Sequence, residues 1–201
     1  MDERSFKDRL QGIFDQLLAM VGAARDAFNR HGLNNLQELQ RLQGLALTEI
    51  NAVIKEVDAL LAQKAEKDKP SWLRSHSVLT HLHIVAENLG GLADPIHRKI
   101  KGTVLFSDKA VSQTNGLFDH QAGMLRSLMD IIKTNNDFLK RYTREEGQRM
   151  IKACLDYATE HEARLIEGVC TPQASPIFLA MLDRLGIIYR HESDIAALLS
   201  Q

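Results

Sequence analysis

The chain has 201 residues, of which 44% are hydrophobic and 5% aromatic, and its 25 Lys and Arg residues nearly balance its 26 Asp and Glu residues. This length and apolar content are typical of a globular protein and exclude disordered and collagen-like chains. A net charge of -1 gives no electrostatic basis for binding a nucleic-acid backbone or an anionic membrane surface. Nucleic acid is therefore not among the expected partners.

The chain also shows no sign of secretion or membrane insertion. Its first ten residues, MDERSFKDRL, alternate in charge where a signal peptide needs an apolar run, and no stretch approaches the roughly 18 apolar residues of a membrane span. Cys154 and Cys170 lie far apart without a CxxC motif, which suggests neither a disulfide scaffold nor a zinc finger. We expect a cytoplasmic protein with no direct membrane insertion.

The first two elements are predicted to be long amphipathic helices. Apolar residues recur every three or four positions over residues 6–28 and again over residues 36–60, which places them on one face of a helix. Gly32 is expected to end the first helix, and Asn34 and Asn35 to begin the second.

A third helix is expected from the candidate N-cap Ser71 to about residue 101, with a kink at Pro95. Ser107 and Asp108 then predict the start of a fourth helix. No segment of the chain shows the alternation of a strand.

Two further helices complete the chain. Thr143 followed by Glu146 has the form of a capping box and predicts the start of a fifth helix, which Gly168 ends. Ser175 and Pro176 predict the start of a sixth helix, with proline in its first turn.

The expected fold is all-α, with six long antiparallel helices in an elongated, spectrin-like bundle. Helices of roughly 25 to 33 residues are about 40–50 Å long, and short loops make neighbouring helices antiparallel. The string GIFDQ, which begins at Gly12, recurs as GLFDH from Gly116. This faint repeat predicts a single domain of two tandem three-helix bundles, about 1–102 and 103–201.

One flank of the predicted third helix carries candidate metal ligands. His83 and Glu87 are spaced i, i+4, so their side chains reach the same region above the helix, and Asp94 follows two turns later. These three residues are the candidate metal site. The alternative is a solvated flank of a bundle helix, because further ligands would have to come from other helices.

Two polar residues interrupt the apolar stripes of the last two helices. His161 falls on the core stripe of the fifth helix, and Glu192 on that of the sixth. Because a buried carboxylate must be protonated, paired or bound to a metal, a His161–Glu192 pair is a reasonable hypothesis, with a purely structural core pair or a small shift in the helix register as the alternatives. Cys154 lies on the same stripe as His161 and is interpreted as a small core residue. The sequence contains no motif that indicates an enzyme.

Several segments together resemble the PhoU family. The run KIKGTVLFSDKA contains Phe106, Ser107 and Ala110 where the family leads into its fourth helix, and His161 and Arg164 match its His-x-x-Arg-Leu segment. The resemblance is greatest to the PhoU-like cytoplasmic domain of bacterial sodium/phosphate cotransporters. It implies two tandem three-helix bundles.

The family's acidic metal motif is altered in this chain. Its pattern LERIGDHAxNIA carries a Glu and an Asp four residues apart, and in the first half Glu87 matches the Glu while Gly91 replaces the Asp. In the second half His191 matches, but Gly186 and Arg190 replace the acidic pair. We therefore expect no cofactor, and iron or zinc only at a remnant site.

The resemblance implies a non-enzymatic regulator or adaptor of phosphate uptake that acts through protein contacts. Its implied partners are a phosphate transporter or a phosphate-sensing histidine kinase, and the transporter would bring it to the membrane. A free-standing protein and a portion of a larger cotransporter remain open, as does a homodimer. Two alternatives to the regulator are a metal-binding helical bundle and a structural, oligomerising scaffold.

Overall fold

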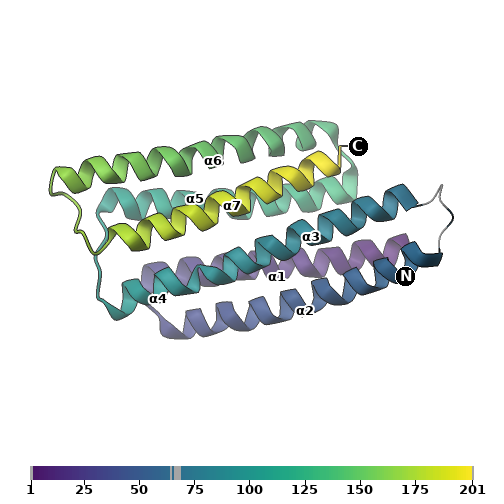
Figure 1. Ribbon diagram of the computed structural model, residues 1–201, viewed down its shortest axis with the longest axis horizontal. Helices are drawn as coiled ribbons and strands as arrows, with labels where there is room; N and C mark the ends of the chain where they lie inside the picture. The colour runs from purple at the N-terminus through teal and green to yellow at the C-terminus, as the bar shows by residue number, and fades with distance from the viewer. Residues whose placement is uncertain (1, 64, 66–68, 201) are drawn as a thin grey trace.

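The computed structural model describes residues 2–63, 65 and 69–200, which form an elongated helical bundle (Figure 1). The described residues contain no strand, so the predicted all-α fold class is confirmed. The helices are α1 (Glu3–Arg30), α2 (Leu33–Gln63), α3 (Lys69–Gly91), α4 (Ala93–Lys101), α5 (Asp108–Thr134), α6 (Asp137–Ile166) and α7 (Ser175–Leu198). The predicted third helix corresponds to α3 and α4 together.

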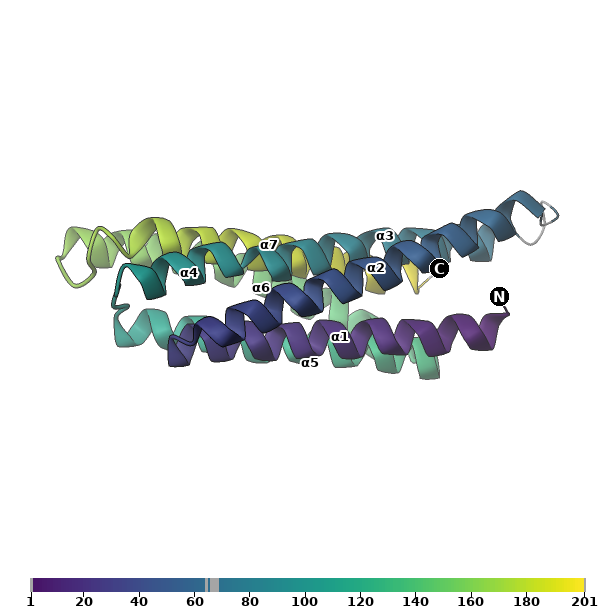
Figure 2. The ribbon, with the colours of Figure 1, turned by 90° about the horizontal axis from the view of Figure 1, so that it is seen from below.

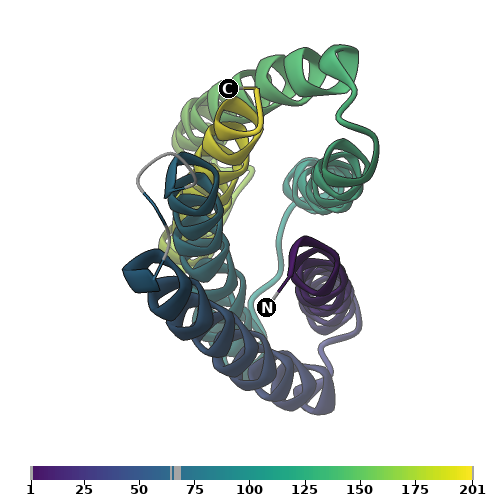
Figure 3. The same ribbon diagram turned by 90° about the vertical axis from the view of Figure 1, so that its right-hand side faces the viewer.

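For description, the helices are grouped by chain order into two units, which pack against each other through α3 on α7 and α1 on α5. The first unit contains α1, α2 and the α3–α4 pair, and the second contains α5, α6 and α7. Seen end-on, α1 lies beside α5 and α3 beside α7, while α2 and α6 occupy opposite ends of the arrangement (Figure 3). From below, α1 and α5 form one layer and α3, α4 and α7 another (Figure 2). One apolar cluster draws side chains from all seven helices, so the core continues from one unit into the other.

Pro95 interrupts the third long helix as expected, but the break lies before the proline. The α-helix stops at Gly91 and resumes at Ala93, with Leu92 in a turn. Proline lacks an N–H, and its ring clashes with the carbonyl group four residues earlier, which here belongs to Gly91. The position of the break follows from that geometry.

The predicted start of the fifth helix at Thr143 is wrong. Helix α6 begins at Asp137, and the Asn136 side chain accepts hydrogen bonds from the backbone N–H groups of Phe138 and Leu139. Thr143 and Glu146 both lie buried inside α6. Residues three apart share a helix face, so a Thr-x-x-Glu pattern also arises where a helix interior turns two polar side chains toward its neighbours.

The predicted caps of the second and third helices are wrong, because α2 begins at Leu33 and α3 at Lys69, which places Asn34, Asn35 and Ser71 inside these helices. The helix ends near Ser107, Gly168 and Pro176 follow the sequence closely. Ser107 caps α5 by accepting from the Ala110 N–H, and Pro176 lies in the first turn of α7. Gly168, just beyond α6, has a φ of 74°, a left-handed conformation that suits glycine. His31 and Asn135 end α1 and α5 in the same left-handed conformation, each with a φ of 52°.

None of the helices described here combines the length and the apolar character needed to cross a membrane.

Candidate functional site

The structure separates the three candidate metal ligands of the first unit. His83 Nε2 lies 3.4 Å from Glu87 Oε1 on α3, whereas Asp94 lies on α4 and forms an ion pair with Arg98 at 2.9 Å. Within the described parts of the chain, no third His, Cys or acidic side chain joins His83 and Glu87. This flank therefore provides a two-residue contact, and Asp94 is engaged elsewhere.

Glu192 and His161 are both buried, as predicted, but they do not pair. Gln121 Nε2 donates a hydrogen bond of 2.5 Å to Glu192 Oε1, while both ring nitrogens of His161 lack a hydrogen-bond partner. His161 packs instead on Phe178, with 5.0 Å between ring centroids. Glu192 lies 14 residues beyond Phe178 on α7, which is about 20 Å along a helix. The hypothesis of a His161–Glu192 pair is therefore wrong, because the two side chains lie at different heights along the long axis of the bundle.

The Glu192 carboxyl group is held neutral by its surroundings. Its side chain is completely buried, and burial raises the pKa well above the usual range, although the hydrogen bond from Gln121 opposes this shift. Glu192 Oε2 and Gln121 Oε1 both lack a hydrogen-bond partner. A protonated Glu192 supplies the donor that this acid–amide pair needs, since its O–H can donate to an amide oxygen.

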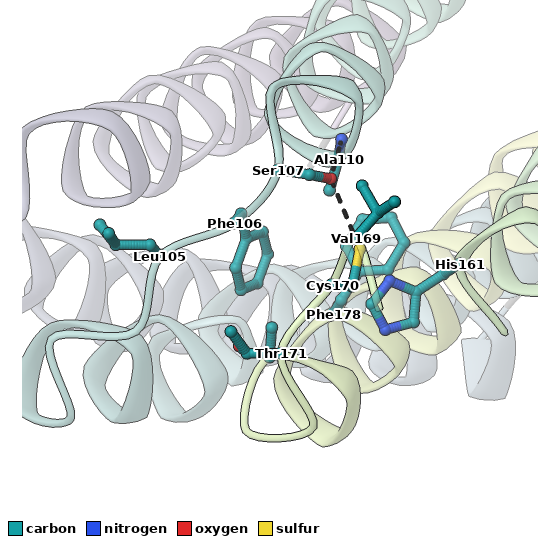
Figure 4. Close-up of a pocket in the computed structure, with 10 residues that line it drawn as sticks. Leu105, Phe106, Ser107, Ala110, His161, Val169, Cys170, Thr171 and Phe178 are labelled. Carbon is teal, nitrogen blue, oxygen red and sulfur yellow. Dashed lines mark hydrogen bonds between the residues drawn. The ribbon is translucent and has the colours of Figure 1, made fainter. Parts of the chain in front are cut away.

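His161 lines a cavity at one end of the bundle, where the α4–α5 connector passes the α6–α7 loop (Figure 4). The cavity has a volume of about 160 Å³, and its wall includes Phe106 and Phe178, whose ring centroids are 5.7 Å apart. Cys170 Sγ, 3.6 Å from Ser107 Oγ, adds a polar edge. Burial, with a smaller effect from Arg164, lowers the pKa of His161. The imidazole therefore presents neutral nitrogens to a small, mainly apolar space.

Exposed apolar side chains surround this cavity. Leu105 on one wall is 74% exposed and Val169 on another is 60% exposed, while Ile166, one turn before Val169, is 87% exposed. These three residues are called the end patch below: Leu105 lies in the α4–α5 connector, Val169 in the α6–α7 loop and Ile166 at the end of α6. A surface of this kind next to a cavity can accept an apolar side chain of another protein.

A third cluster lies in the middle of the molecule, between α3 and α7. His81 Nδ1 lies 2.7 Å from His191 Nδ1 and 4.0 Å from Asp194 Oδ2. Burial is the largest cause of a lowered pKa at His191, followed by the charge of His81. His191 matches a position of the family pattern, whereas no sequence motif points to His81, since only the packing of α3 on α7 brings the two rings together.

Comparison with known proteins connects this fold to one group of structures. No protein-family model matches the sequence. No curated protein matches it either. The crystal structure of PhoU from Pseudomonas aeruginosa aligns with a TM-score of 0.88 over 98% of this chain and 94% of that one, at 13% identity. A second crystal structure, of the phosphate transport system regulatory protein PhoU from Streptococcus pneumoniae, aligns with a TM-score of 0.85 over 98% of this chain and 92% of the other, at 12% identity. The chain has the fold of these PhoU structures, in agreement with the resemblance inferred from its sequence.

Proposed function

We propose that this protein is a non-enzymatic, cytoplasmic regulator of phosphate uptake that acts by binding a phosphate transporter or its signalling partner. The observation that carries the proposal is the agreement of fold along 98% of the chain with proteins of which one is described as a regulator of phosphate transport. The local resemblance of the segments around Phe106 and His161 to the PhoU family supports it independently of the overall fold.

The chemistry of the buried groups favours binding over catalysis. Burial raises the pKa of the Cys154 thiol to about 12, which keeps it protonated and unreactive at neutral pH. Glu192 is a neutral acid enclosed in the core, where no substrate reaches it. Both groups lie inside the bundle, which leaves the exposed surfaces for contacts with a partner.

We propose the end patch as the surface that contacts the partner. Leu105 and Val169 are apolar, largely exposed and placed beside a cavity that can admit an anchoring side chain. The α6–α7 loop of the second unit and the α4–α5 connector between the units meet here, so a bound partner would contact the segment that joins the two units.

A genetic test measures phosphate uptake, and phosphate-responsive gene expression, in the source organism after deletion of the gene. We expect deletion to deregulate uptake and the wild-type gene to restore control. A Leu105→Glu, Val169→Glu variant should fail to restore it and should fail to retain the transporter in a pull-down. The matched control is Leu155→Glu, at a leucine that is 66% exposed on α6 and outside the end patch.

The outcomes separate the two parts of the proposal. Unchanged phosphate uptake after deletion would contradict a role in phosphate regulation. Full restoration by the Leu105→Glu, Val169→Glu variant would retain that role and reject the end patch as the contact surface.

A further inference from the structure

We propose that His81, His191 and Asp194 form a binding site for Zn²⁺ that joins the two three-helix units. His81 belongs to α3 of the first unit, and His191 and Asp194 belong to α7 of the second. This inference depends on neither the proposed function nor the altered acidic motif, because none of the three residues occupies a position of the motif's Glu–Asp pair.

The three ligand atoms are already gathered. One ring nitrogen of each histidine and a carboxylate oxygen of Asp194 all lie within 4.8 Å of one another, and among the described residues this is the one group of three such side chains brought so close. Zinc binds nitrogen and oxygen at about 2.0–2.2 Å in a tetrahedral arrangement, which places neighbouring ligand atoms roughly 3.4 Å apart.

Only small movements are needed to reach that spacing. The His81–His191 contact of 2.7 Å must open slightly, and the separation of 4.0 Å between His81 Nδ1 and Asp194 Oδ2 must close slightly. The side chains of His81 and Asp194 are 25% and 50% exposed, so both have room to rotate. A hydrated metal ion can also reach the site from solvent.

The charges around the two histidines allow them to bind a metal cation. A neutral imidazole carries a nitrogen lone pair that can bind a metal ion, and the Nδ1 atoms of His81 and His191 already face each other at 2.7 Å. Asp194 contributes a negative charge beside the two rings. Arg190 opposes a cation, but its side chain is exposed and can turn toward water.

The donor set identifies the class of metal. Two imidazole nitrogens with one carboxylate suit Zn²⁺ and its borderline neighbours, whereas Mg²⁺ and Ca²⁺ prefer oxygen ligands alone. Three protein ligands leave a fourth position for water or for a donor group from a binding partner. An ion bound there would fix α3 against α7 and hence one unit against the other.

The test is a titration of the full chain, freed of metal with a chelator, with ZnCl₂ in competition with a chromophoric chelator. We expect one Zn²⁺ per chain, bound at roughly micromolar Kd or tighter, and a zinc-dependent rise in Tm. The variants His81→Ala and Asp194→Asn should each weaken binding by roughly tenfold or more and abolish the rise in Tm.

Two controls keep the result interpretable. His83→Ala removes another histidine of α3, the one in contact with Glu87, and should bind zinc like the wild type. Asp194→Asn changes only an exposed side chain, so it tests the site even if His81→Ala perturbs folding, which circular dichroism detects. The proposal is overturned if the wild type shows no saturable one-to-one binding, or if Asp194→Asn binds zinc as tightly as the wild type.

Discussion

Glu192 makes the stability of the folded chain depend on pH. Because its pKa is raised by folding, the unfolded state releases a proton above about pH 4.5 while the folded state keeps it. The stabilising contribution is therefore complete below the unfolded pKa and decreases as pH rises toward the folded pKa, by about 1.4 kcal/mol per pH unit. We expect Glu192→Gln to remove this slope from the free energy of unfolding, measured by urea denaturation at pH 5.5, 6.5 and 7.5.

Glu87→Gln is the control for that experiment, because it removes a carboxylate whose side chain is 56% exposed. The wild-type pH dependence should persist in this control. If wild type and Glu192→Gln show parallel pH profiles, Glu192 does not remain protonated in the folded protein.

Lys99 is a buried cation that stabilises the end of α1. Its Nζ donates a hydrogen bond of 3.2 Å to the Phe28 carbonyl, and it lies 4.8 Å from the centroid of the Phe28 ring and 5.6 Å from that of Phe106. The last carbonyls of a helix lack amide partners, and a positive charge there is favourable. We expect Lys99→Met, which keeps most of the apolar stem, to lower the free energy of unfolding by about 1–2 kcal/mol.

Lys101→Met, at an exposed position two residues away, should change stability by less than about 0.5 kcal/mol in the same urea titration. Equal stabilities for the two variants would show that the contacts of Lys99 contribute nothing beyond those of a surface lysine.

Burial was predictable at the residue scale, but pairing was not. A period of three to four residues places His161 and Glu192 on core stripes without any knowledge of neighbouring helices. The partner of Glu192 is Gln121 on α5. Which residue of another helix lies at the same level depends on how far the helices slide along one another, and no local pattern encodes that distance.

At the scale of the elements, the packing of α6 on α7 depends on Gly147. A Cβ atom at this position would lie 2.9 Å from Ser193 Cβ, an atom fixed close to the backbone of α7. Gly147→Ala should lower the free energy of unfolding by about 1–2 kcal/mol, because overpacking outweighs the gain of about 1 kcal/mol in helix propensity. Thermal or urea denaturation measures the change.

Gly12→Ala is the matched variant, at an exposed position in the interior of α1 where a Cβ meets no atom within 4 Å. It should raise the free energy of unfolding by about 0.5–1 kcal/mol. A stabilised Gly147→Ala protein would mean that α6 and α7 are not in this close contact.

Helix boundaries were predictable where one residue type has a single local role. Ser107 and Pro176 mark helix starts because a hydroxyl cap and a proline in the first turn satisfy or remove otherwise unpaired N–H groups. The prediction at Thr143 was wrong because a Thr-x-x-Glu pattern also occurs inside a helix, as it does here in α6. Asn135 and Asn136 together form the whole turn between α5 and α6, one ending a helix and the next capping its successor.

For the whole molecule, the continuous core predicts that both units unfold together. The single tryptophan, Trp72, packs on Phe6 in the first unit with 5.8 Å between ring centroids, while Cys154 is buried in the second unit. Urea transitions followed by Trp72 fluorescence and by reaction of Cys154 with a thiol reagent should therefore have the same midpoint. The Cys170→Ser background limits labelling to Cys154, and separate midpoints would show that each unit is a stable domain by itself.

The architecture of the whole molecule followed from the sequence more fully than its sites did. Six long apolar stripes joined by short connections leave few arrangements other than an elongated antiparallel bundle. The contact of His81 with His191 joins residues 110 positions apart on helices from different units. This contact depends on how α3 packs against α7. That packing is set by the apolar stripes of the helices in both units together.

The antiparallel course of the helices has a practical consequence for experiments on this protein. The start of α1 and the end of α7 lie at the end of the bundle opposite the end patch (Figure 1). Helix α7 alone, with 24 residues, separates the α6–α7 loop from the C-terminal end by about 36 Å. An affinity tag or a fluorescent protein fused to either terminus would leave the opposite end unobstructed, and a chain immobilised through such a tag would present Leu105 and Val169 outward to the solution.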